Sequence, residues 1–274
     1  MSGRGRRRVT GSRPPALVVA IAIIGLLFFF VAPLAALLQR APWGDVWSIL
    51  TTPEVRDALR LSLECSLAAT ALSMLFGLPI AWLLARTEFR GKAVVRACAV
   101  LPMVLPPVVA GVALLRALGR KGLVGQYLYQ WFDITFPFTT KGVIIAETFV
   151  AMPFLIITVE AALRSLDTRY EDAAATLGAS RWTVLRRVIL PSIGPSLAAG
   201  AALTWARALG EFGATITFAG NFRGVTQTMP LAVYQALEVD SGAAIVLSLV
   251  LLTVSIAVLA LVGRQVYRPV AAST

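Results

Sequence analysis

The feature that most constrains this chain is a set of six apolar segments, each long enough to cross a bilayer as a helix. Such a crossing takes about 20 residues, because the hydrocarbon layer is about 30 Å thick. The segments lie at residues 16–38, 61–84, 94–117, 142–163, 192–219 and 243–263. The sequence therefore predicts an all-α, polytopic membrane protein with six transmembrane helices.

Composition excludes a soluble domain of the same length. Hydrophobic residues make up 58% of the 274 residues and charged residues 14%, whereas about 25% of an ordinary soluble domain is charged. The arginine-rich head before the first segment resembles the start of a signal peptide, but the apolar run behind it is too long for one. We therefore expect this first helix to be retained.

The positions of the basic residues predict the orientation. With the N-terminus inside, 16 of the 25 Lys and Arg residues fall on the inner side, eight fall outside, and Arg207 lies within a span. Basic residues concentrate on the cytoplasmic side of membrane proteins. We therefore expect a multi-pass protein of the cytoplasmic membrane with both termini in the cytoplasm. Topology explains the net charge of +11, so no nucleic-acid partner is expected.

Residues typical of catalysis or metal binding are scarce. The chain has no His, and its two cysteines, Cys65 and Cys98, lie in apolar stretches. The Gly-Lys pair at Gly91 and Lys92 lacks the preceding glycine of a phosphate-binding loop. We expect no catalytic residue, no metal site and no cofactor. The protein would not be an enzyme, and any ATP would be bound by a partner subunit.

The loop between the fourth and fifth spans reads as two short helices joined at a glycine. Asp167 can cap the first helix, and Gly178 can end it in the left-handed conformation. Ser180 can cap the second helix, and Pro191 marks the entry to the fifth span. This element is too polar for the membrane and too small to fold alone, so it requires a partner surface.

The same loop resembles the "EAA" loop with which permeases of ATP-binding-cassette (ABC) importers dock into a cleft of their ATPase. The resemblance rests on Asp172-Ala173-Ala174, Gly178, Val188, Leu190 and Pro191, with Asp in place of Glu and Val in place of Ile. It implies a coupling loop over residues 167–191. The docking residues it implies are Glu171, Asp172, Ala173, Ala174, Leu177, Gly178, Ala179, Ser180, Leu190 and Pro191.

Two further segments resemble molybdate-type permeases. They are the proline-rich run from Leu101 to Gly111 and the run from Arg207 to Asn221, which is followed by Thr226-Gln-Thr-Met-Pro230. Sulfate and thiosulfate permeases are near relatives that usually carry Tyr at the position of Phe212 and Ser at that of Ala214. The resemblance therefore favours molybdate or tungstate.

This resemblance implies the fold of a type I ABC importer permease that translocates molybdate. The expected partners are a second copy of the chain, two cytoplasmic ABC ATPase subunits, an extracytoplasmic molybdate-binding protein and membrane lipid. The expected division is a basic tail (1–15), a first helix with an external loop (16–58), a permease core (59–267) and a short tail (268–274). A sulfate or thiosulfate permease is the alternative, followed by a secondary transporter.

The residues themselves suggest where a pathway would run. Pro102, Pro106 and Pro107 break the helical ladder in the third span, which indicates either a pathway lining or a packing kink. Arg207 and Glu211 are helical neighbours inside a span, which indicates either a pathway charge or a structural ion pair.

Small and hydroxyl residues around this pair suit a gate, and a break is expected near the glycines because the fifth span is longer than needed. Glu64, Glu147 and Glu160 are assigned to packing networks or membrane edges. The predicted pathway and gate residues are Pro102, Pro106, Pro107, Gly111, Arg207, Gly210, Glu211, Phe212, Gly213, Thr215 and Asn221.

Overall fold

The computed structural model describes residues 15–167 and 169–266, so most of the two predicted tails lies outside the described residues. Every regular element in these ranges is a helix, which confirms the all-α prediction. The elements are α1 (Ala16–Leu26), the π-helical turn η1 (Leu27–Val31), α2 (Ala32–Gln39), α3 (Val46–Leu50), α4 (Pro53–Arg86), α5 (Lys92–Val104), α6 (Pro107–Leu118), α7 (Gly125–Phe132), α8 (Thr140–Ser165), α9 (Arg169–Thr176), α10 (Arg181–Val184), the π-helical turn η2 (Leu185–Ile189), α11 (Leu190–Leu209), α12 (Gly213–Ala219), α13 (Met229–Val239) and α14 (Ser241–Val266).

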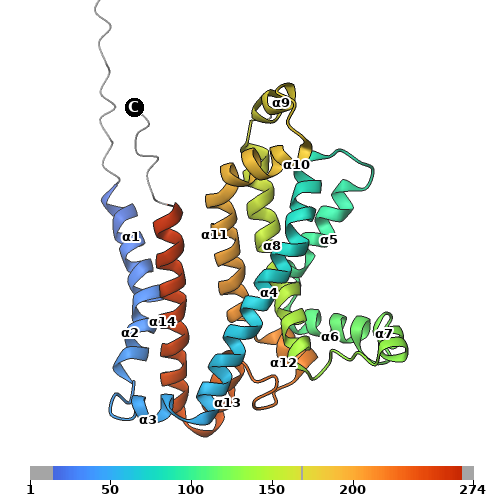
Figure 1. The fold of residues 1–274 in the computed structure, drawn as a ribbon. Coiled ribbons are helices and arrows are strands. Elements are labelled where there is room, and N and C mark those ends of the chain that lie inside the picture. The colour runs from blue at the N-terminus through green and yellow to red at the C-terminus, as the bar shows by residue number, and fades with distance from the viewer. Residues whose placement is uncertain (1–14, 168, 267–274) are drawn as a thin grey trace, which may run out of the picture.

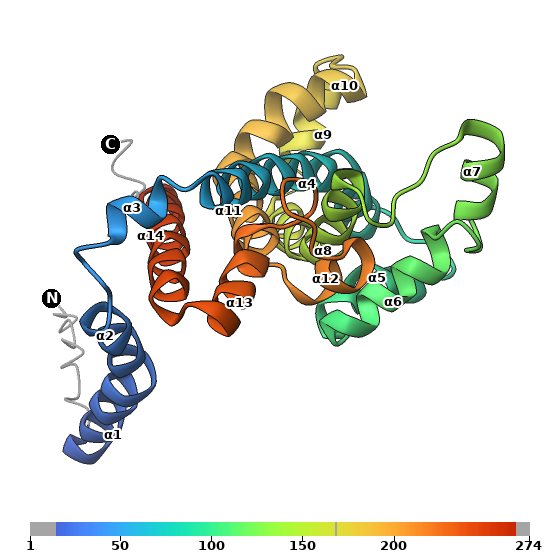
Figure 2. The same ribbon diagram turned by 90° about the horizontal axis from the view of Figure 1, so that it is seen from below.

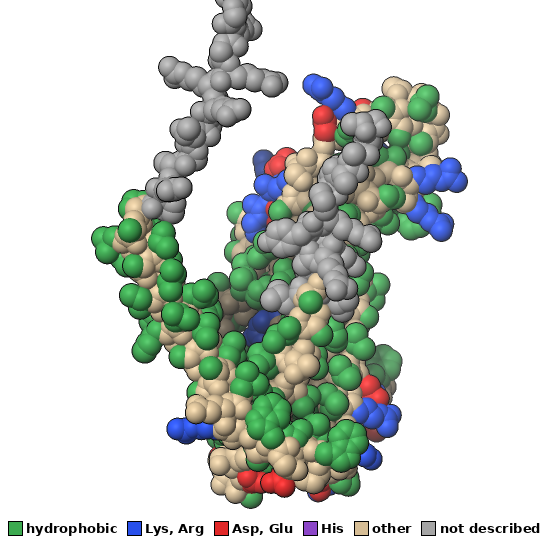
Figure 3. Space-filling model, turned by 90° about the vertical axis from the view of Figure 1, so that its left-hand side faces the viewer, with side chains coloured by type: hydrophobic (Ala, Val, Ile, Leu, Met, Phe, Trp, Pro, Cys, Tyr) green, Lys and Arg blue, Asp and Glu red, His purple; other side chains and the backbone are tan. Residues whose placement is uncertain are grey.

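Five helical runs are long and apolar enough to cross a membrane within the described residues. They are Ala16–Gln39, Pro53–Arg86, Thr140–Ser165, Arg181–Leu209 and Ser241–Val258, the last within α14. Figure 1 shows them side by side, with α9 and α10 at one end of the bundle and α3 and α13 at the other. These are called the α9 end and the α13 end below. On the face drawn in Figure 3, hydrophobic side chains cover the middle, and most charged side chains lie towards the two ends.

Residues 94–117, the expected third span, form two helices instead of one, and the break that the prolines predict there is confirmed at Pro106 and Pro107. The chain forms α5 and α6, of 13 and 12 residues, separated at Leu105 and Pro106. In Figure 1, α6 turns away from the direction of α5 and runs sideways towards α7. Pro106 precedes α6 and Pro107 is its first residue, where a missing backbone N–H costs least. Pro102, in contrast, is buried inside α5 and does not interrupt it.

The core lies where α4, α8 and α11 pack together, with α1 and α7 at opposite edges of the molecule (Figure 2). Leu84 from α4, Leu155 and Val159 from α8, and Ile193 from α11 are buried in one cluster. Gly200 allows α11 to approach α8, because an added Cβ would stand 3.2 Å from the Cβ of Thr158. Close packing of this kind is the main source of helix association in a membrane, since lipid is as apolar as the side chains it replaces.

The helix of the fifth span begins earlier than expected, and it breaks in the region where the sequence predicted a break. The helical run is continuous from Arg181 through η2 into α11, so Pro191 lies inside it rather than at its start. Gly210 and the two residues after it break the run before α12 begins at Gly213. The predicted break near the glycines is therefore confirmed.

Candidate functional site

Helix-capping residues and a left-handed glycine define the α9–α10 pair. Asp167 Oδ1 accepts a hydrogen bond of 2.9 Å from the backbone N–H of Arg169, at the start of α9. Gly178 has φ +81°, with open space around it, so its left-handed conformation reflects the sharp turn between the helices. Ser180 Oγ accepts a hydrogen bond of 3.2 Å from the backbone N–H of Thr183, which caps α10. These local roles agree with the sequence prediction.

The predicted docking residues divide between two faces of the pair. Asp172, Ala173, Leu177, Ser180 and Pro191 are exposed. Glu171 and Leu190 are partly buried, and the partly buried Ala174 and Ala179 pack against the core cluster. Leu177 is 88% exposed, and Trp182, which sequence reasoning missed, is 67% exposed. Large apolar side chains exposed on a polar helix pair are typical of a surface that contacts another protein.

An ion pair also connects α9 to the bundle. Arg86, the last residue of α4, donates from Nη2 to Glu171 Oε1 at 2.5 Å and to the carbonyl oxygen of Leu166 at 3.4 Å. The side chains of Arg86 and Glu171 are 14% and 22% exposed. Sequence reasoning counted Arg86 only as an indicator of topology, because its partner lies 85 residues away.

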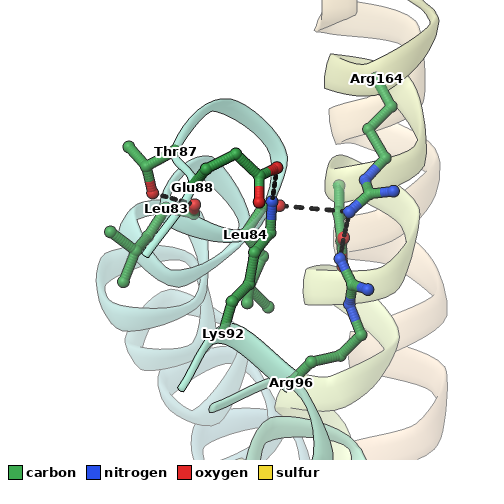
Figure 4. A network of polar contacts seen from close by, with 8 residues as sticks. Leu83, Leu84, Thr87, Glu88, Lys92, Arg96 and Arg164 are labelled. Carbon is green, nitrogen blue, oxygen red and sulfur yellow. Dashed lines mark hydrogen bonds and ion pairs between the residues drawn. The ribbon is translucent and has the colours of Figure 1, made fainter. Parts of the chain in front are cut away.

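A second ion network lies nearby at the α9 end, between α4, α5 and α8 (Figure 4). Glu160 of α8 accepts a hydrogen bond from Arg96 of α5 and pairs with Arg164, 2.9 Å away. Arg164 also donates to the carbonyl oxygen of Leu84, at the end of α4, over 3.3 Å. Glu160 therefore belongs to a packing network, one of the two roles that the sequence suggested.

Towards the α13 end, α6 and α12 approach so closely that only glycine fits at two positions. A Cβ on Gly111 would lie 2.6 Å from the Cβ of Thr217 and 2.8 Å from the carbonyl oxygen of Ala214. A Cβ on Gly213 would lie 2.5 Å from the Cβ of Pro107. Gly210 has more room, its nearest such atom being 3.6 Å away. The predicted residues Pro107, Gly111 and Gly213 thus meet at one contact.

Arg207 and Glu211 form an ion pair of 2.6 Å, although they do not share one continuous helix. Glu211 follows the end of α11, and its Oε1 accepts a hydrogen bond of 2.8 Å from the backbone N–H of Ala214 in α12. Glu211 is 1% exposed, whereas the Arg207 side chain is 29% exposed. The carboxylate therefore links α11, through Arg207, to the first turn of α12.

The remaining predicted pathway residues differ in their surroundings. Thr215 is fully buried, and its hydroxyl has no hydrogen-bond partner in the described part of the chain. Asn221 donates to Gln235 at 3.3 Å, and Phe212 packs on Tyr234 with ring centroids 5.2 Å apart. Pro102 is buried within α5, apart from the α6–α12 contact.

The two other acidic residues assigned to networks or edges differ in their surroundings. Glu64 pairs with Arg60 at 2.6 Å on an exposed surface of α4. Glu147 of α8 is 1% exposed, and its Oε2 has no partner among residues 15–167 and 169–266. The sequence placed Glu147 in or near a span but could not show that it is fully buried, because its burial depends on how α8 packs.

Comparisons with known proteins identify relatives over most of the chain. Residues 77–269 match the family described as "Binding-protein-dependent transport system inner membrane component". The "Molybdenum transport system permease protein ModB" of Mycobacterium tuberculosis is 45% identical over 251 residues, which cover 92% of this chain and 94% of that protein. ModB of Escherichia coli K12 is 42% identical over 213 residues, covering 78% and 93%.

A sulfate relative and two solved structures complete the comparison. The "Sulfate transport system permease protein CysT" of Salmonella typhimurium is 37% identical over 247 residues, covering 89% of each chain. A bacterial ABC transporter that imports alginate matches with a TM-score of 0.72 and 20% identity, over 93% of this chain and 96% of that one. The MetNI methionine ABC transporter matches with a TM-score of 0.55 and 19% identity, over 85% and 98%. These two likenesses show a shared fold.

Proposed function

Since the chain belongs to the family of binding-protein-dependent transport system inner membrane components, we propose that it is the membrane permease of a molybdate importer. ATP would be hydrolysed by separate ABC ATPase subunits, and molybdate would arrive on a separate binding protein. Relatives named for molybdenum transport are 42–45% identical to this chain, and those named for sulfate transport 36–37%. This difference favours molybdate.

The observation that carries the proposal is the exposed α9–α10 pair with its left-handed glycine at Gly178. The pair lies at the end of the bundle where α1 begins and α14 ends (Figure 1). Both termini would therefore be cytoplasmic if the pair docks on a cytoplasmic ATPase. Leu177 and Trp182 supply apolar area for such a contact, and Asp172 supplies a charge.

One continuous helical run connects the docking surface to the opposite end of the bundle. Arg181–Leu209 is one helical run of 29 residues, about 43 Å long if straight, and Arg207 lies in its last turn. Closure of two ATPases on ATP would draw together the α9–α10 pairs of two copies of this chain. The run would then move Glu211 and, through Ala214, the contact of α12 with α6. We assign the gate to this contact.

Selectivity would lie chiefly in the binding protein. Around the proposed gate, Arg207 is already paired with Glu211, so the local charge attracts a dianion only weakly. A pathway that held molybdate tightly would not release it. The import complex would need no cofactor apart from the ATP on the ATPase subunits.

The experiment compares Gly178→Val with Gly224→Val in the assembled importer. Both glycines have a left-handed φ, +81° and +72°, and both have open space around them. The two substitutions therefore introduce similar backbone strain at opposite ends of the molecule. We expect Gly178→Val to abolish ATPase association and ATP-driven molybdate uptake, and Gly224→Val to leave association intact. Undiminished association in Gly178→Val would refute docking through this turn.

Sulfate import is the second candidate, because the sulfate relative of Salmonella typhimurium covers 89% of this chain. Uptake of labelled molybdate is measured with and without a large excess of sulfate. We expect little competition. If unlabelled sulfate and unlabelled molybdate at equal concentrations reduced uptake of the label equally, the substrate would be reassigned.

A further inference from the structure

Two adjacent acidic residues of α9 face in different directions. Glu171 points back to the bundle and binds Arg86, whereas its neighbour Asp172 is exposed. Side chains of consecutive helical residues diverge by about 100°, so one helix can contact its own bundle and a partner at the same time. The two carboxylates therefore differ in the contacts open to them.

Arg86 joins three elements through one group. Its Nη2 donates both to Glu171 in α9 and to the carbonyl oxygen of Leu166, which follows α8, while Arg86 itself ends α4. Its Nε is buried without a partner in the described residues, so the planar group is held between these contacts rather than in solvent. A charge-assisted, partly buried pair fixes an angle better than an exposed one.

The remaining contacts between α9 and the bundle are of a different kind. From α9 and the turn after it, Ala174 and Ala179 pack against the core cluster, each with a single methyl group, while Val184 of α10 belongs to that cluster. Small apolar contacts of this size allow sliding, because they have little directional preference. Among the described residues, the Arg86–Glu171 pair is thus the directional connection between α9 and α4. Through α4, of 34 residues, that connection reaches the opposite end of the bundle.

We infer that Arg86 is a positioning residue that, with Glu171, holds α9 at a fixed angle to α4. Movement of a docked ATPase is thereby transmitted to α4 as well as to α11. Asp172 is left to contact the ATPase. This inference rests on the proposed function, and it separates two roles within one short helix: docking by Asp172 and transmission by Glu171.

The test measures two quantities in the assembled importer with its binding protein: ATPase association, and molybdate imported per ATP hydrolysed. We expect Arg86→Gln and Glu171→Gln to change association by less than about twofold and to lower import per ATP by about tenfold, the effect of losing roughly 1.4 kcal/mol of coupling. Exchanging the charges, Arg86→Glu with Glu171→Arg, is expected to restore most of the import. Asp172→Asn is expected to weaken association instead.

The matched control is the pair of Glu88 and Lys92, which are 2.6 Å apart near the same end of the bundle. Removing that pair with Glu88→Gln is expected to change neither quantity. Unchanged import per ATP in both Arg86→Gln and Glu171→Gln would overturn the inference. An equal loss of ATPase association in Arg86→Gln, Glu171→Gln and Asp172→Asn would overturn it too. Failure of the unmodified chain to bind any ABC ATPase would instead refute the proposed function. Glu171→Gln keeps the test valid if Arg86→Gln does not fold, because Glu171 lies outside the buried core.

Discussion

At the α9 end, oppositely charged side chains join helices far apart in the sequence, whereas at the α6–α12 contact glycines let two helices touch directly. Arg86 reaches Glu171 across 85 residues, and Arg96 reaches Glu160 across 64. Gly111 and Gly213, in contrast, leave no room for a single added carbon. The first kind of contact can break and reform in water. Contacts of the second kind tolerate no added atom.

This difference suits the two tasks that we propose. A surface that must follow a moving partner needs directional links that tolerate hydration, and ion pairs near a membrane surface meet that need. A gate must exclude ions when closed, and close backbone packing leaves little space for them. The Arg207–Glu211 pair is intermediate between a hydrated ion pair and a buried contact, since one partner is buried and the other is partly exposed.

The largest effect is expected at Glu211, because its carboxylate satisfies both Arg207 and the N–H of Ala214. Glu211→Ala removes both contacts and leaves a partly buried arginine alone, which should cost about 3 kcal/mol of stability. Thermal unfolding in detergent measures this loss. Glu211→Gln retains an oxygen for Ala214 and should lose less. If the two variants unfold at the same temperature, the hydrogen bond to α12 contributes nothing.

A smaller effect is expected from Gly111→Val. Its Cβ would overlap Thr217 and a backbone oxygen of Ala214, so α6 must move from α12 at a cost of about 2 kcal/mol. We expect a lower unfolding temperature and leakage of molybdate without ATP. Gly25→Val is the control, because nothing lies within 4 Å of its added carbon. Normal ATP-dependent uptake without leakage would remove this contact from the gate.

The smallest effect is expected from Glu160→Gln, which should cost about 1 kcal/mol because Arg96 and Arg164 are both substantially exposed. High salt should reduce the difference in unfolding free energy between Glu160→Gln and the unmodified chain. Glu88→Gln is the reference, because the Glu88 side chain is 90% exposed. The hydrogen bond from Lys92 lowers the pKa of Glu88, so its contribution would be present at neutral pH and lost on acidification. A larger loss in Glu88→Gln than in Glu160→Gln would contradict the comparison.

Apolar length and capping residues were enough to predict the long helices and the α9–α10 pair. Apolar length identified the runs now seen as α4, α8 and α14. Asp167, Gly178 and Ser180 act locally, through backbone groups two or three residues away, so their roles could be read from the sequence.

What could not be predicted depends on direction and on distant partners. Pro106 and Pro107 predicted a break within residues 94–117, but neither the prolines nor hydropathy predicted the direction in which α6 turns away from α5. Arg86 could be placed at a helix end but not opposite Glu171. The spacing of Arg207 and Glu211 predicted their pairing, and the glycines predicted the break between α11 and α12, but neither predicted the hydrogen bond from Ala214 to Glu211.

The helical run Ala16–Gln39 buries no residue against the rest of the described chain. Deleting it would open no cavity in the core. Such a run can be added to or lost from a permease without repacking its neighbours. We therefore expect the number of crossings to vary among otherwise similar proteins, while the segment from α4 to α14 stays intact.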